Sequence, residues 1–330
     1  MITPANRRLG VSRRSLLTAA LISPFAARAA TAPVLRLGVL QFGTVQWVAE
    51  IIRSHRLDQA HGFTLEMVTL ANNDAGRVAL MARSADVVVS DWFFVAAQRN
   101  AGTMLSFSPF TSAAGGVLVP ATSPIRTLAD LRGARLGVAG GPVDKAWLLL
   151  QATARAREGL DLATAAHPVY GAPPLLNAKL QQGELDAVLT FWNFAARLEA
   201  QGFRQVISVA EAARALDLPS KLSLIGFVFH EAWAQRDPAL LSGFLAAAAA
   251  EQMLAQNPQA WTPIRPLMEA PEPALFTRLR DRFIDGIDHP SQAEQLHAAE
   301  HLFDILLKTG GTRATADMTR LPDGVFWPTS

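Results

Sequence analysis

The stretch that decides the fold is Thr127-Leu128-Ala129-Asp130-Leu131-Arg132-Gly133, followed without a linker by the run Ala134–Ala139. The first seven residues read as a short capped helix with a glycine stop, and the run after them is typical of a strand. Residues 140–142, Gly-Gly-Pro, then lead into a second helix through Trp147. Helix, strand, glycine loop and helix in this order predict one unit of a parallel sheet covered by helices.

The same alternation continues on both sides of this unit. Upstream, strands are predicted at 34–40, 63–67, 86–90, 104–110 and 116–120, with helices at 44–59, 75–83 and 93–100 between the earlier ones. Downstream, strands are predicted near 167–169, 186–191, 205–209 and 222–230, with helices at 175–182 and 194–201. The segments 238–256, 258–268, 273–286 and 291–309 read as helix. The pattern therefore predicts two successive α/β units and a helical C-terminal tail.

The two α/β units join without a long Gly/Ser linker, near Ala121–Pro124 and again near Pro219–Leu224. We therefore expect a two-lobed α/β protein in which each lobe is a mainly parallel sheet flanked by helices. Residues 30–123 and 224–330 would form lobe 1, and residues 124–223 would form lobe 2. Two crossings of this kind place a cleft between the lobes, and such clefts bind ligands and close around them by hinge motion.

The N-terminus differs from the rest of the chain in charge. Residues 1–29 contain five arginines and no acid, whereas the remainder has 25 basic and 28 acidic residues and a net charge of −3. Ser12–Leu17 is a twin-arginine pattern, an apolar stretch follows to Ala27, and Ala27-Arg28-Ala29 is a small-x-small cleavage site. Residues 1–29 are therefore predicted to be a twin-arginine signal peptide. The apolar stretch is shorter than the ~20 residues that a membrane-spanning helix needs.

Composition excludes several classes of protein. Half of the residues are hydrophobic, which is enough to bury a large core and excludes disorder. There is no cysteine, so disulfides, thiolate metal sites and a cysteine nucleophile are excluded. The mildly acidic body has no electrostatic footprint for nucleic acid. The exported chain is expected to have no transmembrane segment, because no other stretch of 18 uninterrupted apolar residues occurs.

Four segments resemble a known family. Leu37–Trp47, Asp86–Asp91, Thr127–Val138 and Leu180–Val188 are similar to the corresponding elements of periplasmic solute-binding proteins of the nitrate/sulfonate/taurine (NitT/TauT-like) type, which feed ABC importers. The resemblance implies a type II periplasmic-binding-protein fold of the Venus flytrap kind, monomeric, without a cofactor and with no catalytic residues. It implies an ABC permease in the inner membrane as partner. The family binds anions, pyrimidines and aromatics, so the resemblance leaves the ligand open.

The candidate site is predicted from the rule that ligands bind beyond the carboxyl ends of parallel strands, where helix N-termini point backbone N–H groups inward. Four loops meet this description, and the resemblance points to the same four. Their candidate ligand-binding residues are Gln41, Phe42, Thr44, Gln46, Ser90, Asp91, Trp92, Gly140, Gly141, Asp144, Trp192 and Asn193. The loops contain no arginine, and the nearest lysine is Lys145.

This composition suggests roles for the side chains. We expect hydrogen bonds to the ligand from Thr44, Gln46, Ser90 and Asn193. The ligand would pack against the rings of Trp92 and Trp192, and its positive charge would be balanced by Asp91 and Asp144. Two carboxylates favour a cationic, zwitterionic or heteroaromatic ligand over a simple anion. Each residue also has a structural alternative. Asp91, Asp144 and Thr44 can cap helices, the tryptophans can belong to the core, and Asn193 can be a turn residue.

Three other functions stay open at this point. Asp91 and Asp144 could be two ligands of a calcium- or lanthanide-type ion, although such ions need six to eight oxygens. Relatives with this fold also include pyrimidine-precursor proteins that use pyridoxal phosphate, but the chain has only four lysines and no cysteine. His297-Ala298-Ala299-Glu300-His301 matches an inverted zinc-peptidase pattern, yet no glutamate follows Glu300 as a further ligand. We therefore expect a receptor and not an enzyme.

Overall fold

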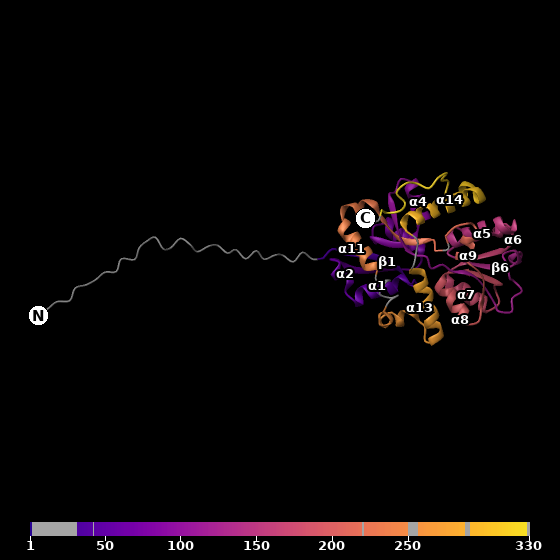
Figure 1. The fold of residues 1–330 in the computed structure, drawn as a ribbon, viewed down its shortest axis with the longest axis horizontal. Coiled ribbons are helices and arrows are strands. Elements are labelled where there is room, and N and C mark those ends of the chain that lie inside the picture. The colour runs from indigo at the N-terminus through magenta and orange to yellow at the C-terminus, as the bar shows by residue number, and fades with distance from the viewer. Residues whose placement is uncertain (2–31, 42, 220, 250–256, 288–290, 329–330) are drawn as a thin grey trace. The chain divides into compact units, whose positions relative to one another are not determined.

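The computed structural model describes Met1 and residues 32–328, except for residues 42, 220, 250–256 and 288–290. The chain divides into two units, Met1–Thr31 and Ala32–Ser330. The predicted signal peptide and its cleavage site lie outside the described residues, apart from Met1, and so does the candidate Phe42. All elements below belong to the second unit (Figure 1).

Lobe 1 is built on a five-stranded sheet with the order β2-β1-β3-β10-β4. Its strands are β1 (Val34–Leu40), β2 (Thr64–Leu70), β3 (Val87–Asp91), β4 (Leu105–Thr111) and β10 (Ile225–His230). β1 pairs in parallel with β2 and β3, whereas β10 runs antiparallel to β3 and β4. Four of the five strands therefore point the same way, and the sheet is mainly parallel as expected.

Lobe 2 repeats this plan with the order β7-β6-β8-β5-β9. Its strands are β5 (Gly116–Val119), β6 (Arg135–Ala139), β7 (His167–Gly171), β8 (Ala187–Thr190) and β9 (Arg204–Ser208). β6 is parallel to β7 and β8, and β5 is antiparallel to β8 and β9. Within Thr127–Ala139, β6 forms where the sequence predicts a strand, whereas the predicted short capped helix is the 3₁₀ turn η1 (Ala129–Leu131), without a side-chain cap.

The first crossing between lobes differs from the predicted one. β5 pairs with strands of the second sheet, so the chain leaves lobe 1 at 112–115 and not at 121–124. Gly115 makes this passage possible, because a Cβ there would lie 1.6 Å from the carbonyl oxygen of Thr190. The predicted lobe boundary at residue 123 is therefore too late. The second crossing runs through 215–224 and enters β10 at Ile225.

Helices cover both sheets. In lobe 1 they are α1 (Val45–Ser54), α2 (Leu57–Ala60), α3 (Asn73–Met81), α4 (Trp92–Asn100), α10 (Glu231–Arg236) and α11 (Pro238–Ala248). In lobe 2 they are α5 (Lys145–Glu158), α6 (Leu162–Ala165), α7 (Pro173–Gln181), α8 (Trp192–Ala200) and α9 (Val209–Arg214). The predicted helix 44–59 is divided, since Arg56 adopts a left-handed conformation between α1 and α2.

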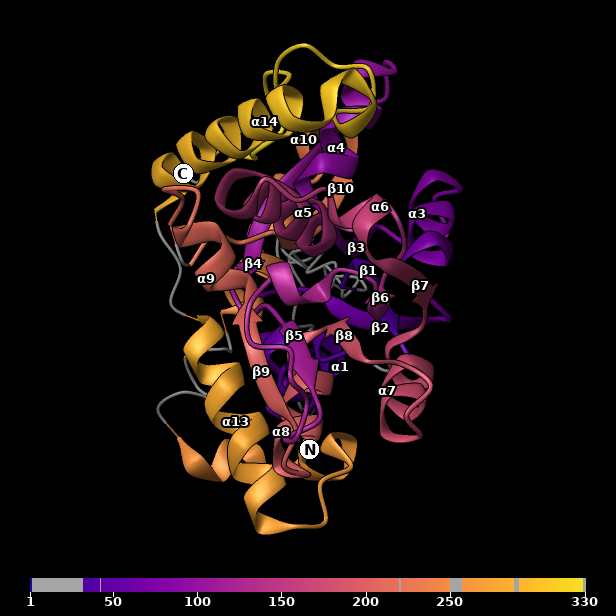
Figure 2. The same cartoon turned by 90° about the vertical axis from the view of Figure 1, so that its right-hand side faces the viewer.

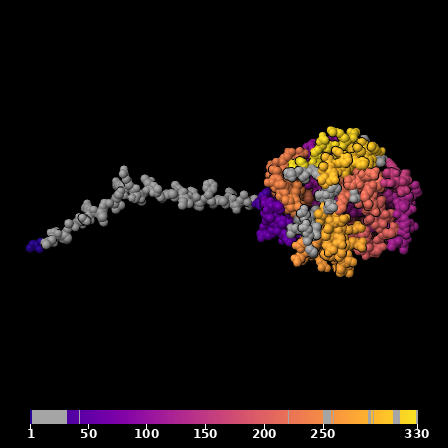
Figure 3. All heavy atoms as spheres, in the orientation of Figure 1, coloured from indigo at the N-terminus to yellow at the C-terminus, as the bar shows by residue number. Residues whose placement is uncertain are grey.

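The C-terminal tail connects the two lobes. It contains the 3₁₀ turns η2 (Pro258–Trp261) and η3 (Arg265–Met268) and the helices α13 (Pro273–Ile287) and α14 (Gln292–Ala314). In the space-filling view, orange and yellow residues of this tail lie between the indigo part of lobe 1 and the magenta part of lobe 2 (Figure 3). α14 packs on α4 through the stacked rings of Phe303 and Phe93, 5.8 Å apart, and it also contacts α5. The core around these helices therefore contains side chains from both lobes.

An ion-pair cluster ties α8 of lobe 2 to α13. Glu199 accepts hydrogen bonds from Arg278 at 3.0 Å and from Arg282, and its side chain is only 10% exposed. Arg197, two residues earlier on the same helix, donates to the carbonyl oxygen of Met268 at 2.7 Å. These contacts fasten lobe 2 to the tail beside the junction between the lobes.

Replacing Glu199 by Gln is expected to lower the free energy of unfolding by about 1–2 kcal/mol. The amide cannot balance two guanidinium charges, but both arginines are partly exposed, so water screens part of the loss. Urea denaturation measures the change. Glu211→Gln in the exposed capping box of α9 is the control, because Gln can still accept from the Ser208 backbone. Equal destabilisation by both variants would mean that the α8–α13 contact contributes nothing specific.

Candidate functional site

The carboxyl ends of the two sheets meet at one junction. Asp91 at the end of β3 pairs with Lys145 beyond β6, and Trp47 beyond β1 contacts Trp192 beyond β8. Figure 2 shows the elements from the lobe 2 side, with β6 and β8 in front of β1 and β3. Side chains from the two lobes touch each other across this junction. Their contacts define what the site can bind.

Asp91 is the centre of the charged part of the junction. It is the N-cap of α4, where one carboxylate oxygen accepts from the Phe94 N–H at 2.8 Å. The other oxygen accepts from Arg77 of α3 at 2.8 Å. Lys145, the first residue of α5 in lobe 2, places its ammonium 3.8 Å from the same carboxylate. Asp91 therefore caps a helix, as the structural alternative predicts, and also pairs with cations from both lobes.

Arg77 is the residue that the loop-based prediction missed. It lies in the second turn of α3 and not in a strand-end loop, so a survey of the loops for cations passes over it. Its guanidinium stacks over the Phe94 ring at 4.9 Å. The sequence does hold a signal: α3 leads from β2 into β3, so its first turns lie near the carboxyl edge of a parallel sheet. The site thus contains an arginine, which the survey of the loops missed, as well as Lys145, which the sequence identifies as the nearest lysine.

Asp144 is the N-cap of α5 and lies close to Asp91. One of its oxygens accepts from the Ala146 N–H at 2.9 Å and the Trp147 N–H at 3.3 Å. The other faces Gly140, where a Cβ would lie 2.5 Å from it, and Gly140 has a φ of +86°. Burial, with a smaller contribution from the Asp91 charge, raises the pKa of Asp144 to about 6, against the opposing pull of the Trp147 N–H and Lys145. Asp144 is therefore poised to gain a proton at mildly acidic pH.

The aromatic candidates belong to packed clusters. Trp192, 6% exposed, begins α8 and lies edge-on to Trp47 of lobe 1, with ring centroids 5.8 Å apart and perpendicular planes. It also contacts Phe283 of α13 at 6.1 Å. Trp92 is completely buried against Phe93 at 5.1 Å. Trp92 thus belongs to the core, and Trp192 joins the lobes by an aromatic contact.

Some of the polar candidate side chains already make hydrogen bonds within the protein, and others do not. Gln46 donates to the carbonyl oxygens of Leu40 at 2.7 Å and Gln41 at 3.0 Å, so it closes the β1–α1 turn. Gln41 itself is exposed. Thr44 occupies the N-cap position of α1 but makes no capping hydrogen bond, because it has helical backbone angles; the predicted cap is wrong. Asn193 is buried, and Gly141 is open to substitution except for its φ of +99°.

Several buried polar atoms near the junction have no hydrogen-bond partner among the described residues. They are Arg77 Nε, Ser90 Oγ, Trp92 Nε1 and Thr190 Oγ1. Two of them are N–H donors and two are hydroxyls, which can also donate. Unpaired buried donors are costly. Trp92 Nε1 lies in the core, so the donors that a solute with acceptor oxygens would satisfy are Arg77 Nε, Ser90 Oγ and Thr190 Oγ1.

The arrangement is unfavourable for a metal ion. Both Asp91 oxygens are engaged by N–H donors, and two cations stand beside the carboxylate. Across the described part of the chain, no group of three or more His, Asp or Glu side chains could hold a metal. His297 and His301 of the peptidase-like pattern are both exposed on α14. The same part of the chain contains no helix of the length and apolarity that crossing a membrane requires.

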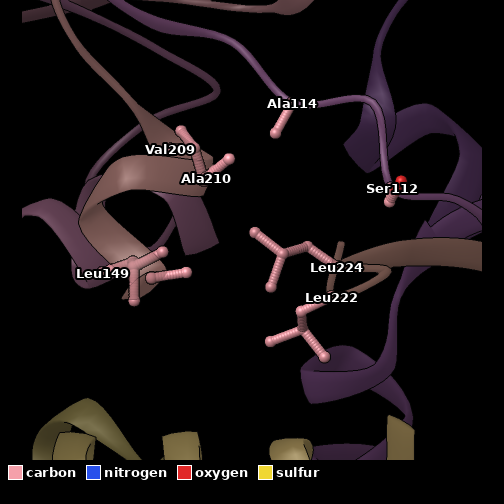
Figure 4. Close-up of a pocket in the computed structure, with 8 residues that line it drawn as sticks. Ser112, Ala114, Leu149, Val209, Ala210, Leu222 and Leu224 are labelled. Carbon is pink, nitrogen blue, oxygen red and sulfur yellow. The ribbon is translucent and has the colours of Figure 1, made fainter. Parts of the chain in front are cut away.

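A separate apolar cavity lies between the two crossings and is lined by Ser112 and Ala114 of the first, Leu222 and Leu224 of the second, and side chains of α5 and α9 (Figure 4). Its volume of about 10 Å³ suits at most one water molecule. This hinge cavity is therefore not a solute site.

Comparisons with known proteins agree with this architecture. Residues 108–260 match the family model described as NMT1/THI5 like. The alkanesulfonate-binding protein SsuA from Xanthomonas axonopodis pv. citri, bound to MOPS, has a TM-score of 0.68 and 20% identity, over 90% of this chain and 97% of its own. The aliphatic sulphonate-binding protein SsuA from Escherichia coli has a TM-score of 0.67 and 21% identity, over 89% and 97%. The fold is that of the periplasmic solute-binding proteins.

The resemblance of the sequence to solute-binding proteins of the nitrate/sulfonate/taurine type is thus confirmed at the level of the fold. This periplasmic-binding-protein fold also occurs in the desulfurization enzyme DSZB, which has a TM-score of 0.58 and 15% identity over 90% of this chain and 96% of its own. A search of curated proteins found no match to the chain. The fold alone is therefore compatible with both binding and catalysis, and the chemistry of the site decides between them.

Proposed function

We propose that the chain is a periplasmic solute-binding receptor of an ABC importer, which closes its two lobes on a small zwitterionic solute. The observation that carries the proposal is the charge pattern at the junction. Asp91 is bracketed by Arg77 at 2.8 Å and by Lys145 from the other lobe at 3.8 Å, with Asp144 nearby. Charges of both signs on opposing lobes suit a solute that carries both signs itself.

The sequence left three classes of ligand open: cationic, zwitterionic and heteroaromatic. The charges at the junction favour the zwitterionic class. A cation alone would have to compete with Arg77 and Lys145 for Asp91. An anion alone would meet two carboxylates, although it would supply the acceptors that the unpaired donors lack. The neighbour from Xanthomonas axonopodis is described as bound to MOPS, which carries a sulfonate and an amine that can be protonated. A solute with an acid group and an amine satisfies both halves of the junction.

As a receptor the protein would make and break no bonds and would need no cofactor. Its function would be differential affinity: the closed form binds the solute, and the permease in the inner membrane recognises the closed form. The exported protein would act as a monomer in the periplasm, after transport by the twin-arginine route. Ser90 of β3 and Asn193 of α8, both buried, are the candidates for hydrogen bonds to the solute.

A thermal-shift screen of the purified, chelator-treated protein tests this function. The panel contains aminoalkanesulfonates, MOPS, alkanesulfonates, nitrate, polyamines, pyrimidines, calcium and lanthanum. A zwitterion at about 100 times its Kd should add about 2.7 kcal/mol and raise the melting temperature by several degrees. A response confined to calcium and lanthanum would replace this function by metal binding. A response confined to pyrimidines would replace it by pyrimidine-precursor binding.

Asp91→Asn is expected to weaken binding of the zwitterion at least tenfold, because a charge-assisted contact contributes about 1.5–3 kcal/mol. Asp86→Asn is the matched control. Asp86 directly precedes β3 and pairs with Arg36 at 2.7 Å, at the opposite end of that strand from Asp91. Calorimetric titration of both variants measures the effect. Unchanged affinity in Asp91→Asn would remove this carboxylate from the site.

A further inference from the structure

Lys145 of lobe 2 contacts both an aromatic ring and a carboxylate of lobe 1. It belongs to lobe 2, yet its ammonium lies 4.3 Å from the centroid of the Phe93 ring and 3.8 Å from Asp91, both in lobe 1. The Lys145 side chain is 12% exposed, and Phe93 is buried. A carboxylate beside an aromatic face is a typical recognition site for an organic cation. Lobe 1 therefore presents such a site, and a side chain of lobe 2 lies in it.

The ammonium is only loosely held there. Its one short hydrogen bond is to the carbonyl oxygen of Val143, two residues earlier in its own lobe, at 2.8 Å. The distance of 3.8 Å to Asp91 is an ion pair without a hydrogen bond, because it exceeds hydrogen-bonding distance. Each Asp91 oxygen accepts one hydrogen bond, from Phe94 or Arg77, and keeps a second acceptor site. A lysine has three donors, so this group has spare hydrogen-bonding capacity. Another ammonium could take its place without breaking a short contact between the lobes.

We infer that Asp91 and Phe93 form a recognition site for a primary ammonium group, which Lys145 occupies as a tethered competitor. This rests on the proposed function, because it assigns the amine of the zwitterion to this site. The solute amine would take the place beside Asp91 and over Phe93. The displaced Lys145 ammonium would then be free to pair with the acid group of the same solute. The Lys145–Asp91 ion pair is thereby replaced by two ion pairs, one between Asp91 and the solute amine and one between Lys145 and the solute acid group. The solute then links the charged groups of the two lobes.

Chemical rescue tests the inference without any zwitterion. Lys145→Ala removes three methylene groups and the ammonium, which together correspond to n-propylammonium. With n-propylammonium chloride at tens of millimolar, we expect the melting temperature of Lys145→Ala to rise by about 2–4 °C more than that of the wild type. Sodium propionate and tetramethylammonium chloride at equal ionic strength are the solute controls. Lys145→Met is the protein control, because its side chain still fills the site.

The double variant Lys145→Ala/Asp91→Asn should lose the rescue. Equal shifts in the wild type, the single variant and the double variant would overturn the inference, and so would an equal shift with tetramethylammonium. If Lys145→Ala does not fold by itself, its refolding yield is measured with and without n-propylammonium. A yield that rises supports the site, and an unchanged yield overturns it. If n-propylammonium fails to rescue Lys145→Ala while zwitterions stabilise the wild type in the thermal-shift screen, the proposed function stands. Only the assignment of the solute amine to this site is then overturned.

Discussion

Trp192→Ala is expected to lower the free energy of unfolding by about 3–5 kcal/mol, the usual cost of removing a buried tryptophan. The ring lies edge-on to Trp47 of α1 and beside Phe283 of α13, so its loss opens a cavity where lobe 1, lobe 2 and the C-terminal tail meet. Chemical denaturation followed by circular dichroism measures the change. The same variant is expected to loosen the contact between the lobes.

Trp192→Phe is the matched control, because a smaller ring retains most of the aromatic contact and should cost much less. The pair of variants also separates the two roles considered for this residue. A packing residue gives a large loss of stability in Trp192→Ala. A ligand wall at an open surface gives nearly unchanged stability and a selective loss of solute affinity, and that outcome would contradict the interlobe packing described here.

Asp144→Asn is expected to change how stability depends on pH. The folded pKa of Asp144 is raised to about 6 from an ordinary value of 3.8, mainly by burial of the carboxyl. The folded protein therefore holds this proton more tightly than the unfolded chain does. The resulting stabilisation is complete below pH 4 and is lost as the pH rises through 6, an amount of about 2–3 kcal/mol. Asparagine keeps an oxygen for capping α5 but does not ionise.

The difference in unfolding free energy between Asp144→Asn and the wild type should therefore favour the variant increasingly from pH 4 to pH 7. Denaturation curves at pH 4, 5, 6 and 7 give the difference directly. Asp130→Asn provides the opposite sign, because hydrogen bonds from the Arg126 and Thr127 backbones lower the pKa of Asp130. The wild type should gain on that variant as the pH rises to about 4, the ordinary pKa of Asp130, and the difference should then stay nearly constant up to pH 7. A difference for Asp144→Asn that does not change with pH would contradict the burial of its carboxyl.

The sequence predicts the strands and the two lobes well because the signals are local. β3 is a run of valines, and β6 follows a glycine stop, so each can be located without its partners. Local sequence signals do not predict to which sheet β5 belongs. Its place depends on pairing with β8 and β9, 70 to 90 residues away, and on the close passage at Gly115. Strand order, rather than strand position, is what the sequence leaves undetermined.

The candidate site shows the same division. Asp91, Asp144, Ser90, Trp192 and Asn193 follow from the strand-end rule. Two of them make contacts between the lobes, since Asp91 pairs with Lys145 and Trp192 lies against Trp47. Arg77 does not follow from it, because it reaches Asp91 from a helix turn. The role of Gln46 could not be foreseen either, since its hydrogen bonds go to the backbone of its own turn. The roles of Arg77 and Gln46 depend on the direction in which each side chain points, and residue type alone does not predict that direction.

We expect a zwitterion to bind where Asp91 and Lys145 meet, with its amine contributing to affinity. Isothermal titration of the wild-type protein with 3-aminopropanesulfonate and with propanesulfonate tests it most directly, since the two probes differ only in the amine. We predict that the amino compound binds at least tenfold more tightly, which corresponds to about 1.4 kcal/mol. Equal or tighter binding of propanesulfonate would contradict the account and identify the junction as a site for simple anions.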